Sequence, residues 1–153
     1  MSSLVFTGFN PAHDDIFRSR LEMSNLPTAD LNGPDRLFFR LSDDNGLIGY
    51  IGLEGAGPDR LLRSLVVMGG RRGQGYGRQL VDRLELLARD GGIERLHLLT
   101  TTAAPFFHAL GYAITDRASA PAPIAASAEF SMLCPANATY MNKGLVDAAA
   151  RPS

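Results

Sequence analysis

The spacing of apolar residues changes between two periods along this chain, and the changes mark its expected elements. Short runs rich in branched apolar and aromatic residues predict strands at 4–9, 37–41, 47–53, 61–68, 95–100, 112–115 and 138–142. Apolar residues at helical spacing predict helices at 12–23, at 80–88 with Gly91-Gly92 as the stop, at 104–110 and, starting near Pro123, at 123–133. Residues 26–31 form either a loop or a restarted helix. Asp43-Asp44-Asn45-Gly46 is typical of a hairpin turn.

The segment between the strand at 61–68 and the helix that follows carries glycines at 73, 75 and 77. Glycine has no Cβ, so the backbone amides of such a loop can approach a ligand closely. The amides at a helix N-terminus also lack partners inside the helix, and the helix dipole favours negative charge there. Strand, loop and helix together therefore predict an anion-binding site.

Two better-known phosphate loops fit these glycines poorly. A dinucleotide-binding loop needs Gly-x-Gly-x-x-Gly, but here the third glycine comes one residue early and two arginines precede the first. A Walker loop needs Gly-Lys followed by Ser or Thr, which the sequence lacks. A flexible glycine turn with solvated arginines is the remaining alternative.

Composition narrows the class of protein. With 153 residues, 45% of them hydrophobic and 20% charged, the chain suits one globular domain, which we expect over 1–147 with a flexible tail at 148–153. A net charge of −1 favours neither nucleic acid nor a membrane surface as partner. The single cysteine and three dispersed histidines indicate no metal site. Without a signal peptide or an apolar span, a cytoplasmic location is expected.

Arg72, Gly75 and Gly77 form the pattern Arg-x-x-Gly-x-Gly, which resembles the pyrophosphate signature of the GNAT superfamily of N-acetyltransferases. The predicted order of strands and helices also resembles that family over nearly the whole chain. The resemblance implies an α/β (α+β) GNAT acyl-CoA N-acyltransferase fold, a mixed and mostly antiparallel sheet of about seven strands flanked by helices. It also implies acetyl-CoA as cofactor.

Four segments resemble a subfamily, the arsenic-resistance-operon N-acetyltransferases, which is itself similar to the acetyltransferase domain of glutamate N-acetyltransferases. These segments are 26–31, 61–67, 99–103 and Glu129-Phe130 with Leu133-Cys134-Pro135. The resemblance points to an amino-acid-like acceptor and to arsenic or toxic amino-acid resistance. It leaves the identity of the acceptor open.

Several site residues follow from the family resemblance. The pyrophosphate is expected on the amides of a loop made of Gly73, Gln74, Gly75, Tyr76, Gly77 and Arg78, with Arg72 adding charge. Backbone groups of Val66 and Val67 are expected to bind the pantetheine arm as an added strand would. One of these two amides, for which we take Val67, is also expected to face the thioester oxygen.

The general base and the general acid depart from the family pattern. Many members carry a glutamate on the central strand, but 61–68 has no carboxylate, and Glu54 at the end of the preceding strand is the nearest candidate. Its alternative is a solvated residue at a turn. Many members also place a tyrosine four residues before the glycine that ends the short helix. Phe107 stands there and cannot donate a proton, so we expect it to pack beside the CoA arm.

Polar residues on inner strands are the candidates for acceptor recognition. Arg63 lies within the central strand, where an arginine is unusual unless it is paired or binds a carboxylate. Ser64, Thr100 and Thr101 offer hydroxyl groups to a substrate. For the threonines, capping of the next helix is an equally good interpretation. Such a set suits a small anionic amino acid.

The sequence therefore predicts an enzyme that acetylates the amino group of a small amino-acid-like molecule. A protein or peptide N-acetyltransferase is the first alternative. A weakly catalytic acyl-CoA-binding regulatory domain is the second, favoured by Phe107 and the unclear base. The family resemblance also leaves open a homodimer.

Overall fold

The structure is a computed structural model that describes residues 3–133 and 137–145. Cys134 and the predicted tail at 148–153 lie outside the described residues. The chain divides into a first unit, Met1–Glu54 with Leu62–Leu84, and a second unit, Gly55–Leu61 with Glu85–Ser153. One domain over 1–147 stays a prediction. Within the described part, none of the helices has the length and apolar character needed to span a bilayer.

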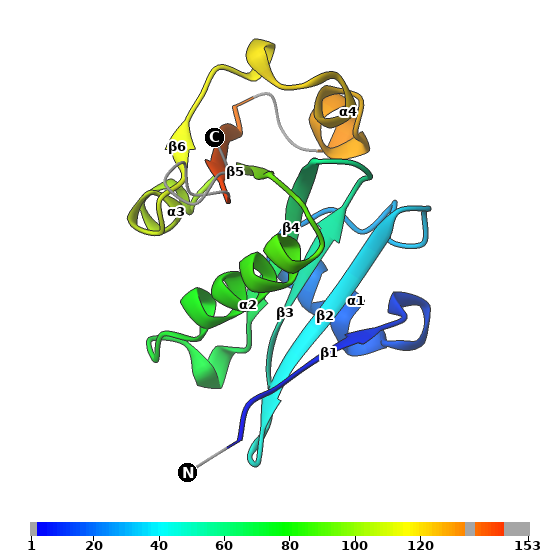
Figure 1. Cartoon of the computed structure of the whole chain (residues 1–153). Coiled ribbons are helices and arrows are strands. Elements are labelled where there is room, and N and C mark those ends of the chain that lie inside the picture. Colours follow the sequence, from blue (N-terminus) through cyan, green and yellow to red (C-terminus); the bar gives the residue numbers. More distant parts are fainter. Residues whose placement is uncertain (1–2, 134–136, 146–153) are drawn as a thin grey trace. The chain divides into compact units, whose positions relative to one another are not determined.

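In the described part of the chain, seven strands form a mixed sheet in the order β1-β2-β3-β4-β5-β7-β6 (Figure 1). Their bounds are β1 Val5–Phe9, β2 Arg36–Asp43, β3 Gly46–Glu54, β4 Asp59–Val67, β5 Arg95–Thr100, β6 Ala113–Ile114 and β7 Thr139–Gly144. Strands β4 and β5 pair in parallel, whereas β1–β2, β2–β3, β5–β7 and β6–β7 are antiparallel. This mixed sheet flanked by helices confirms the predicted fold class.

The first unit is built on the hairpin of β2 and β3, and its predicted turn is confirmed by the pairing of Asp43 with Gly46. Helix α1 (Asp15–Met23) packs on one face, where Phe17 joins Phe38 and Tyr50 in a buried cluster. Helix α2 (Tyr76–Asp90) begins on the other face. A Cβ added at Gly49 would collide with the Val66 carbonyl and lie 2.9 Å from Leu80, so β3 needs glycine there.

The second unit contains β5, β6, β7 and two short helices, α3 (Ala104–Ala109) and α4 (Ala122–Ala125). Its core joins Leu61, Ile124, Phe130 and Tyr140. His97 is buried: its Nδ1 lies 2.8 Å from the Tyr140 hydroxyl and its Nε2 lies 2.7 Å from Asp59 Oδ1. Burial lowers the pKa of His97 and outweighs the opposite effect of Asp59.

Two predicted helices are wrong in extent, and short polar side chains explain both. Instead of one helix over 12–23, a 3₁₀ turn occupies Pro11–His13, and α1 starts only after Asp14, whose carboxylate accepts the Phe17 amide at 3.0 Å. Instead of one helix over 123–133, α4 ends at Ala125. The Ser127 hydroxyl donates to the Ile124 carbonyl at 2.7 Å and so competes with helix continuation. A separate π-turn follows at Glu129–Leu133.

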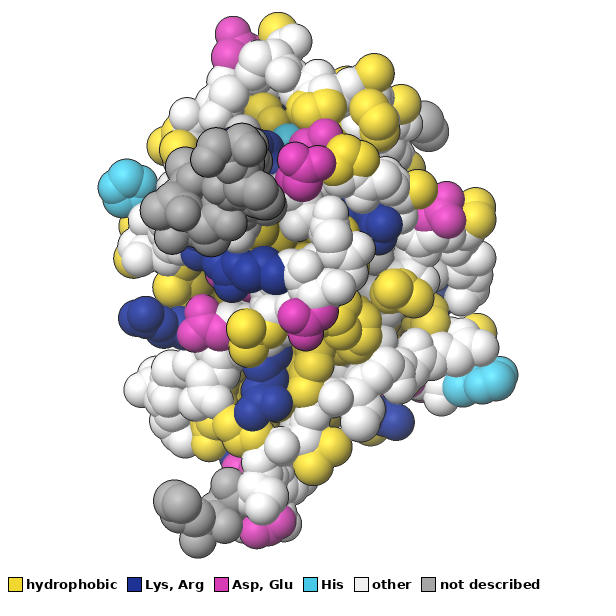
Figure 2. All heavy atoms as spheres, viewed as in Figure 1, with side chains coloured by type: hydrophobic (Ala, Val, Ile, Leu, Met, Phe, Trp, Pro, Cys, Tyr) yellow, Lys and Arg dark blue, Asp and Glu magenta, His cyan; other side chains and the backbone are white. Residues whose placement is uncertain are grey.

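On the face shown in Figure 2, Lys and Arg side chains lie beside Asp and Glu side chains instead of gathering into a patch of one sign. This mixture agrees with the formal net charge of −1.

Candidate functional site: the glycine loop and the central strand

The glycine loop connects β4 to α2 and lies at the surface. After β4 ends at Val67, a 3₁₀ turn covers Gly69–Arg71, and α2 begins at Tyr76. Gly73 has a φ of 78° and Gly75 a φ of 81°, values that residues with a Cβ rarely adopt. A Cβ at either position would meet nothing within 4 Å. The glycines are therefore needed for backbone conformation, and the space beside them is open.

The amides of this loop and of the first helical turn are available to a ligand. The Gly75 carbonyl accepts the Gln79 amide at 3.2 Å, which places Gly75 at the start of the helix. Within the described residues of the first unit, the backbone amides of 72–78 donate no backbone hydrogen bond. These N–H groups stand at the positive end of the α2 dipole, so the arrangement is suited to an anion.

Arginines near the loop differ in what they contact. Arg72 is exposed, with its Nε 3.5 Å from the Val67 carbonyl, and Arg78 is exposed and 3.8 Å from Asp82. Arg71 instead binds Asp43 through two hydrogen bonds of 2.7 and 2.8 Å. Its hydrogen bonds and charge hold the pKa of the Asp43 carboxyl below its usual value, against the effect of desolvation. Arg72 and Arg78 are thus the arginines here whose charge is open to solvent.

The central strand β4 has an irregular backbone just before the two valines expected to bind pantetheine. Ser64 has a φ of 59° although it lies within a strand and is buried. A non-glycine residue held in this region costs roughly 1–3 kcal/mol and persists only where its surroundings fix it. Val66 is buried, whereas Val67 is partly exposed. The Met68 amide bonds the Ile48 carbonyl at 2.8 Å, which ties the end of β4 to β3.

Arg63, expected either to be paired or to bind a substrate carboxylate, is paired in this structure. Its side chain is 0% exposed and forms a bidentate ion pair with Asp30 at 2.6 and 2.7 Å. It also donates to Glu54 at 2.8 Å and, through Nε, to the Ser64 hydroxyl at 3.3 Å. The cluster of Arg63, Asp30, Glu54 and Arg36 is the buried ion cluster of the first unit.

Glu54 is buried, with 7% of its surface exposed, so its interpretation as a solvated turn residue is wrong. The physical reason is its partners: Arg63 at 2.8 Å and Arg36 at 3.6 Å keep the carboxylate inside the protein. Its role as general base stays a prediction. The structure therefore brings Glu54, Arg63 and Ser64 together.

Sequence reasoning missed Asp30 as a member of this cluster. Asp30 accepts from Arg36 at 3.1 Å as well as from Arg63. Burial alone would raise the pKa of Asp30, but the hydrogen bonds and charges of Arg63 and Arg36 outweigh it and hold the pKa below its usual value. The available signal was a single carboxylate between the apolar residues of 26–31, a segment that forms turns here and no restarted helix.

The other predicted site residues belong to the second unit. The Thr100 hydroxyl accepts the amide of Ala103, the N-cap residue of α3, at 3.0 Å, so it orders the turn before α3 and does not cap the helix itself. Thr101 is exposed. Phe107 is buried, and its ring packs edge-on against Tyr112, with centroids 5.5 Å apart. Their predicted contacts with acceptor and CoA stay predictions.

Solved structures share this fold at low sequence identity. The N-acetylglutamate synthase of Neisseria gonorrhoeae, complexed with coenzyme A and N-acetyl-glutamate, superposes with a TM-score of 0.77 at 17% identity, over 96% of this chain and 36% of that chain. An aminoglycoside 6'-N-acetyltransferase complexed with coenzyme A gives a TM-score of 0.69 at 18% identity, over 97% of this chain and 99% of that chain. At these identities the likeness shows the fold alone.

Sequence comparison gives a closer but shorter match. The N-alpha-acetyltransferase 80 of Mus musculus is 43% identical over 56 residues, which is 37% of this chain and 18% of that protein. The present chain thus matches less than a fifth of this relative. The family model described as "Acetyltransferase (GNAT) domain" matches residues 34–114, more than half of the chain. The chain belongs to the GNAT acetyltransferase family.

Proposed function

We propose that this chain transfers the acetyl group of acetyl-CoA to the primary amine of a small amino-acid-like molecule. In the reaction, the neutral amine attacks the thioester carbon and the C–S bond breaks. The products are an N-acetylated amine and the free thiol of CoA, and the proton lost by the nitrogen balances the one gained by sulfur. The observation that carries this proposal is the open row of amides at 72–78, at the end of the central strand of a GNAT domain.

The CoA pyrophosphate would bind the amides of the glycine loop. Gly73 and Gly75 adopt positive φ and leave the surface beside them open, so phosphate oxygens reach the N–H groups without a side chain in the way. Gln74, Tyr76 and Gly77 contribute backbone amides in the same way. The exposed Arg72 and Arg78 would add positive charge. The coenzyme A held by the structural neighbours supports CoA as the cofactor.

The acetyl group would lie against the end of β4. The strained Ser64 changes the direction of the backbone before Val66 and Val67, which supports an outward-facing amide there. We take the Val67 amide as the donor to the oxyanion, because Val67 is partly exposed whereas Val66 is buried. A donor of this kind acts where negative charge develops, on the carbonyl oxygen of the tetrahedral intermediate.

The acceptor must lose a proton before it attacks. An α-amine with a pKa of about 8 is roughly one-tenth neutral at pH 7, whereas a lysine amine with a pKa of about 10.4 is neutral less than one part in a thousand. Glu54 is the candidate base, but its carboxylate is engaged by Arg63. An α-amine that loses its proton to water therefore fits this site better than a lysine side chain.

Phe107 occupies the position at which many family members have a tyrosine, so no tyrosine hydroxyl there can protonate the leaving thiolate. A thiol with a pKa of about 8.5 can leave as thiolate and take its proton from water, at a modest cost in rate. Phe107 packs against Phe106 and Tyr112 within the second unit, which supports a packing role for its ring.

The finer assignment concerns the acceptor. The resemblance to the arsenic-resistance-operon acetyltransferases and the N-acetyl-glutamate held by a structural neighbour both support an amino-acid-like acceptor, with resistance to arsenic-containing or toxic amino acids as the cellular role. A second candidate is a peptide N-terminal acetyltransferase. It is favoured by the 43% identity to N-alpha-acetyltransferase 80 over 56 residues. Both candidates use an α-amine.

Release of CoA thiol, followed with a chromogenic disulfide, tests the proposal. The purified chain would be mixed with acetyl-CoA and either free L-amino acids, peptides with free N-termini, or an aminoglycoside. Turnover with free amino acids supports the first function, and turnover with peptides alone supports the second. Tight CoA binding without turnover on any amine would contradict both and indicate a regulatory acyl-CoA-binding domain.

A further inference from the structure

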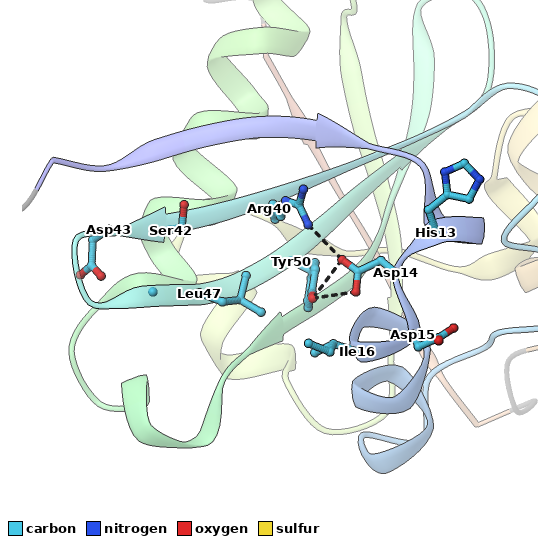
Figure 3. Close-up of a pocket in the computed structure, with 10 residues that line it drawn as sticks. His13, Asp14, Asp15, Ile16, Arg40, Ser42, Asp43, Leu47 and Tyr50 are labelled. Carbon is cyan, nitrogen blue, oxygen red and sulfur yellow. Dashed lines mark hydrogen bonds and ion pairs between the residues drawn. The ribbon is translucent and has the colours of Figure 1, made fainter.

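A pocket of about 560 Å³ lies in the first unit, between the start of α1 and the β2–β3 hairpin. Cavities of roughly 300–1,000 Å³ are the usual size for small-molecule sites. Figure 3 shows Arg40 on β2 and Tyr50 on β3 directed at Asp14, with Ile16 and Leu47 beside the same space. None of the predicted site residues lines this pocket, so it is a feature that sequence reasoning missed.

Arg40 offers a positive charge with open donors. Its side chain is 46% exposed, and its Nη1 lies 3.2 Å from Asp14 Oδ2. Its guanidinium carbon stands 5.3 Å from the centroid of the Phe9 ring, within the range of a cation–π contact. Among the interactions given for the described residues, this ion pair accounts for one guanidinium N–H, so an edge is left for a carboxylate. Arg63 and Arg71, by contrast, hold bidentate carboxylates already.

Asp14 and Tyr50 place a negative charge and a hydroxyl donor opposite Arg40. The Tyr50 hydroxyl lies 3.4 and 3.3 Å from the two Asp14 oxygens, which are long distances for O–H···O bonds. Burial, followed by the charge of Asp14, raises the pKa of Tyr50, so its hydroxyl stays protonated at neutral pH. Asp14 is thus the group in this trio that attracts an ammonium ion.

The wall of the pocket also has apolar surface. Ile16 is 56% exposed, although isoleucine is normally buried. It lines the pocket together with Leu47, which packs against the core cluster of this unit. A ligand with an apolar stem next to its charged groups would cover both side chains.

The pocket lies next to the strand on which the thioester is proposed to bind. Tyr50 and Val66 belong to the same buried cluster, and the Met68 amide bonds the Ile48 carbonyl at 2.8 Å. Neighbouring strands are about 4.8 Å apart. A molecule seated on Tyr50 is therefore about one strand from the backbone of Val66 and Val67.

We propose that this pocket is the acceptor subsite and that it selects a free α-amino acid. Arg40 binds the α-carboxylate, Asp14 attracts the α-ammonium group, and Ile16 with Leu47 contacts the side chain. This inference rests on the proposed acetyl transfer and names its substrate class. It assigns carboxylate recognition to Arg40 in place of Arg63.

Arg40→Gln tests the assignment when free amino acids are compared with their amides. L-methionine, L-glutamate and the α-carboxamide of each serve as acceptors, and kcat/KM is measured by thiol release. The wild-type chain should prefer the free acids at least tenfold. Arg40→Gln should lower kcat/KM for the acids at least tenfold and for the amides less than threefold, which removes the preference. The KM for acetyl-CoA should change less than twofold.

The matched control is Arg83→Gln on α2, which should leave both acceptor classes unchanged. An unaltered acid-to-amide preference in Arg40→Gln would overturn the assignment of Arg40. A wild-type chain that acetylates amides as well as acids, or peptides alone, would overturn the inference and leave acetyl transfer intact. No turnover on any amine would overturn the proposed function and this inference with it.

Discussion

Two parts of the first unit carry positive charge near β4, and they differ in how completely their hydrogen-bond donors are paired. In the buried ion cluster, Arg63 is 0% exposed and binds Asp30 and Glu54. In the glycine loop at 72–78, the backbone amides have no acceptor among the hydrogen bonds given for the described residues of the unit, and Arg78 is 70% exposed. The donors of the buried ion cluster are therefore paired within the protein, whereas the amides of the glycine loop face solvent.

This difference separates a structural role from a binding role. A paired, desolvated guanidinium can bind a ligand only if its present carboxylates leave it, and buried charges without partners are costly. Open amides at a helix N-terminus are paired by water in the free protein and can exchange that water for phosphate oxygens. We therefore propose that the ion cluster serves stability and the shape of β4 at Ser64, and that the loop binds the cofactor.

The largest expected effect is the loss of stability in Asp30→Asn. This change keeps the size of the side chain but removes the charge that Arg63 and Arg36 face. Removing one partner of a buried pair leaves an uncompensated charge and typically costs about 3–5 kcal/mol. Urea unfolding followed by circular dichroism should show a loss in this range, about 3 kcal/mol because Asp30 is not fully enclosed.

The matched control is Asp82→Asn, because Asp82 also faces an arginine but is 55% exposed and 3.8 Å from Arg78. An exposed pair of this kind contributes about 0.5 kcal/mol or less. Equal losses in Asp30→Asn and Asp82→Asn would mean that the ion cluster does not hold the first unit together.

Gly75→Asp should have the next largest effect, this time on cofactor binding. Both Asp and Asn tolerate positive φ better than other side chains, so Gly75→Asn serves as the control for strain at φ 81°. The added carboxylate would stand close to the proposed pyrophosphate, and repulsion between charges at about 4 Å reaches a few kcal/mol near a protein surface. Isothermal titration should show CoA binding weakened on the order of 100-fold by Asp, with Asn much closer to wild type.

If Gly75→Asp and Gly75→Asn bound CoA equally well, the loop would not be the pyrophosphate site. The unfolding transitions of the two variants should match each other, since both carry the same backbone strain at φ 81° and a Cβ there would meet nothing within 4 Å.

Acid should destabilise the first unit through Asp30, by a smaller amount than its substitution. The pKa of Asp30 is lower in the folded protein than its usual value. Its contribution is therefore complete above the unfolded pKa of about 3.9 and is lost as pH falls through the folded pKa. Unfolding free energies measured from pH 6 down to pH 3 should fall less steeply in Asp30→Asn than in wild type. Parallel curves would contradict the assigned ion pair.

Much of the fold was predictable from sequence because each strand of the first unit has its own apolar pattern and its own turn. Asp43-Asp44-Asn45-Gly46 specifies the hairpin locally, and Gly46 has the positive φ of 112° that such a turn uses. The helix boundaries were less predictable. Asp14 and Ser127 act through single side-chain hydrogen bonds, and periodicity does not detect these.

The part of the candidate site that could be predicted from sequence is the glycine loop, because its proposed binding groups are backbone amides of one continuous segment. The glycines at 73 and 75 signal their conformation directly in the sequence. Arg63 showed that a partner was needed but not which one, because Asp30 lies 33 residues away and meets it only in the folded unit. The pocket lined by Asp14, Arg40 and Tyr50 brings together the start of α1, β2 and β3. A local sequence pattern cannot predict that residues from separate elements come together in this way.

The smallest expected effect distinguishes the two open arginines of the loop. Arg72 lies near the end of β4, with its Nε 3.5 Å from the Val67 carbonyl, whereas Arg78 lies in the first turn of α2 and faces Asp82. A guanidinium next to the pyrophosphate contributes about 1 kcal/mol when exposed, and salt screens it. Arg72→Gln should therefore weaken CoA binding about fivefold at low ionic strength and less at high salt, while Arg78→Gln should weaken it less than twofold. A larger effect of Arg78→Gln in the same titrations would shift the phosphate contact into the first turn of α2. If the effect of Arg72→Gln did not depend on salt, Arg72 would contribute to CoA binding through packing and not through its charge.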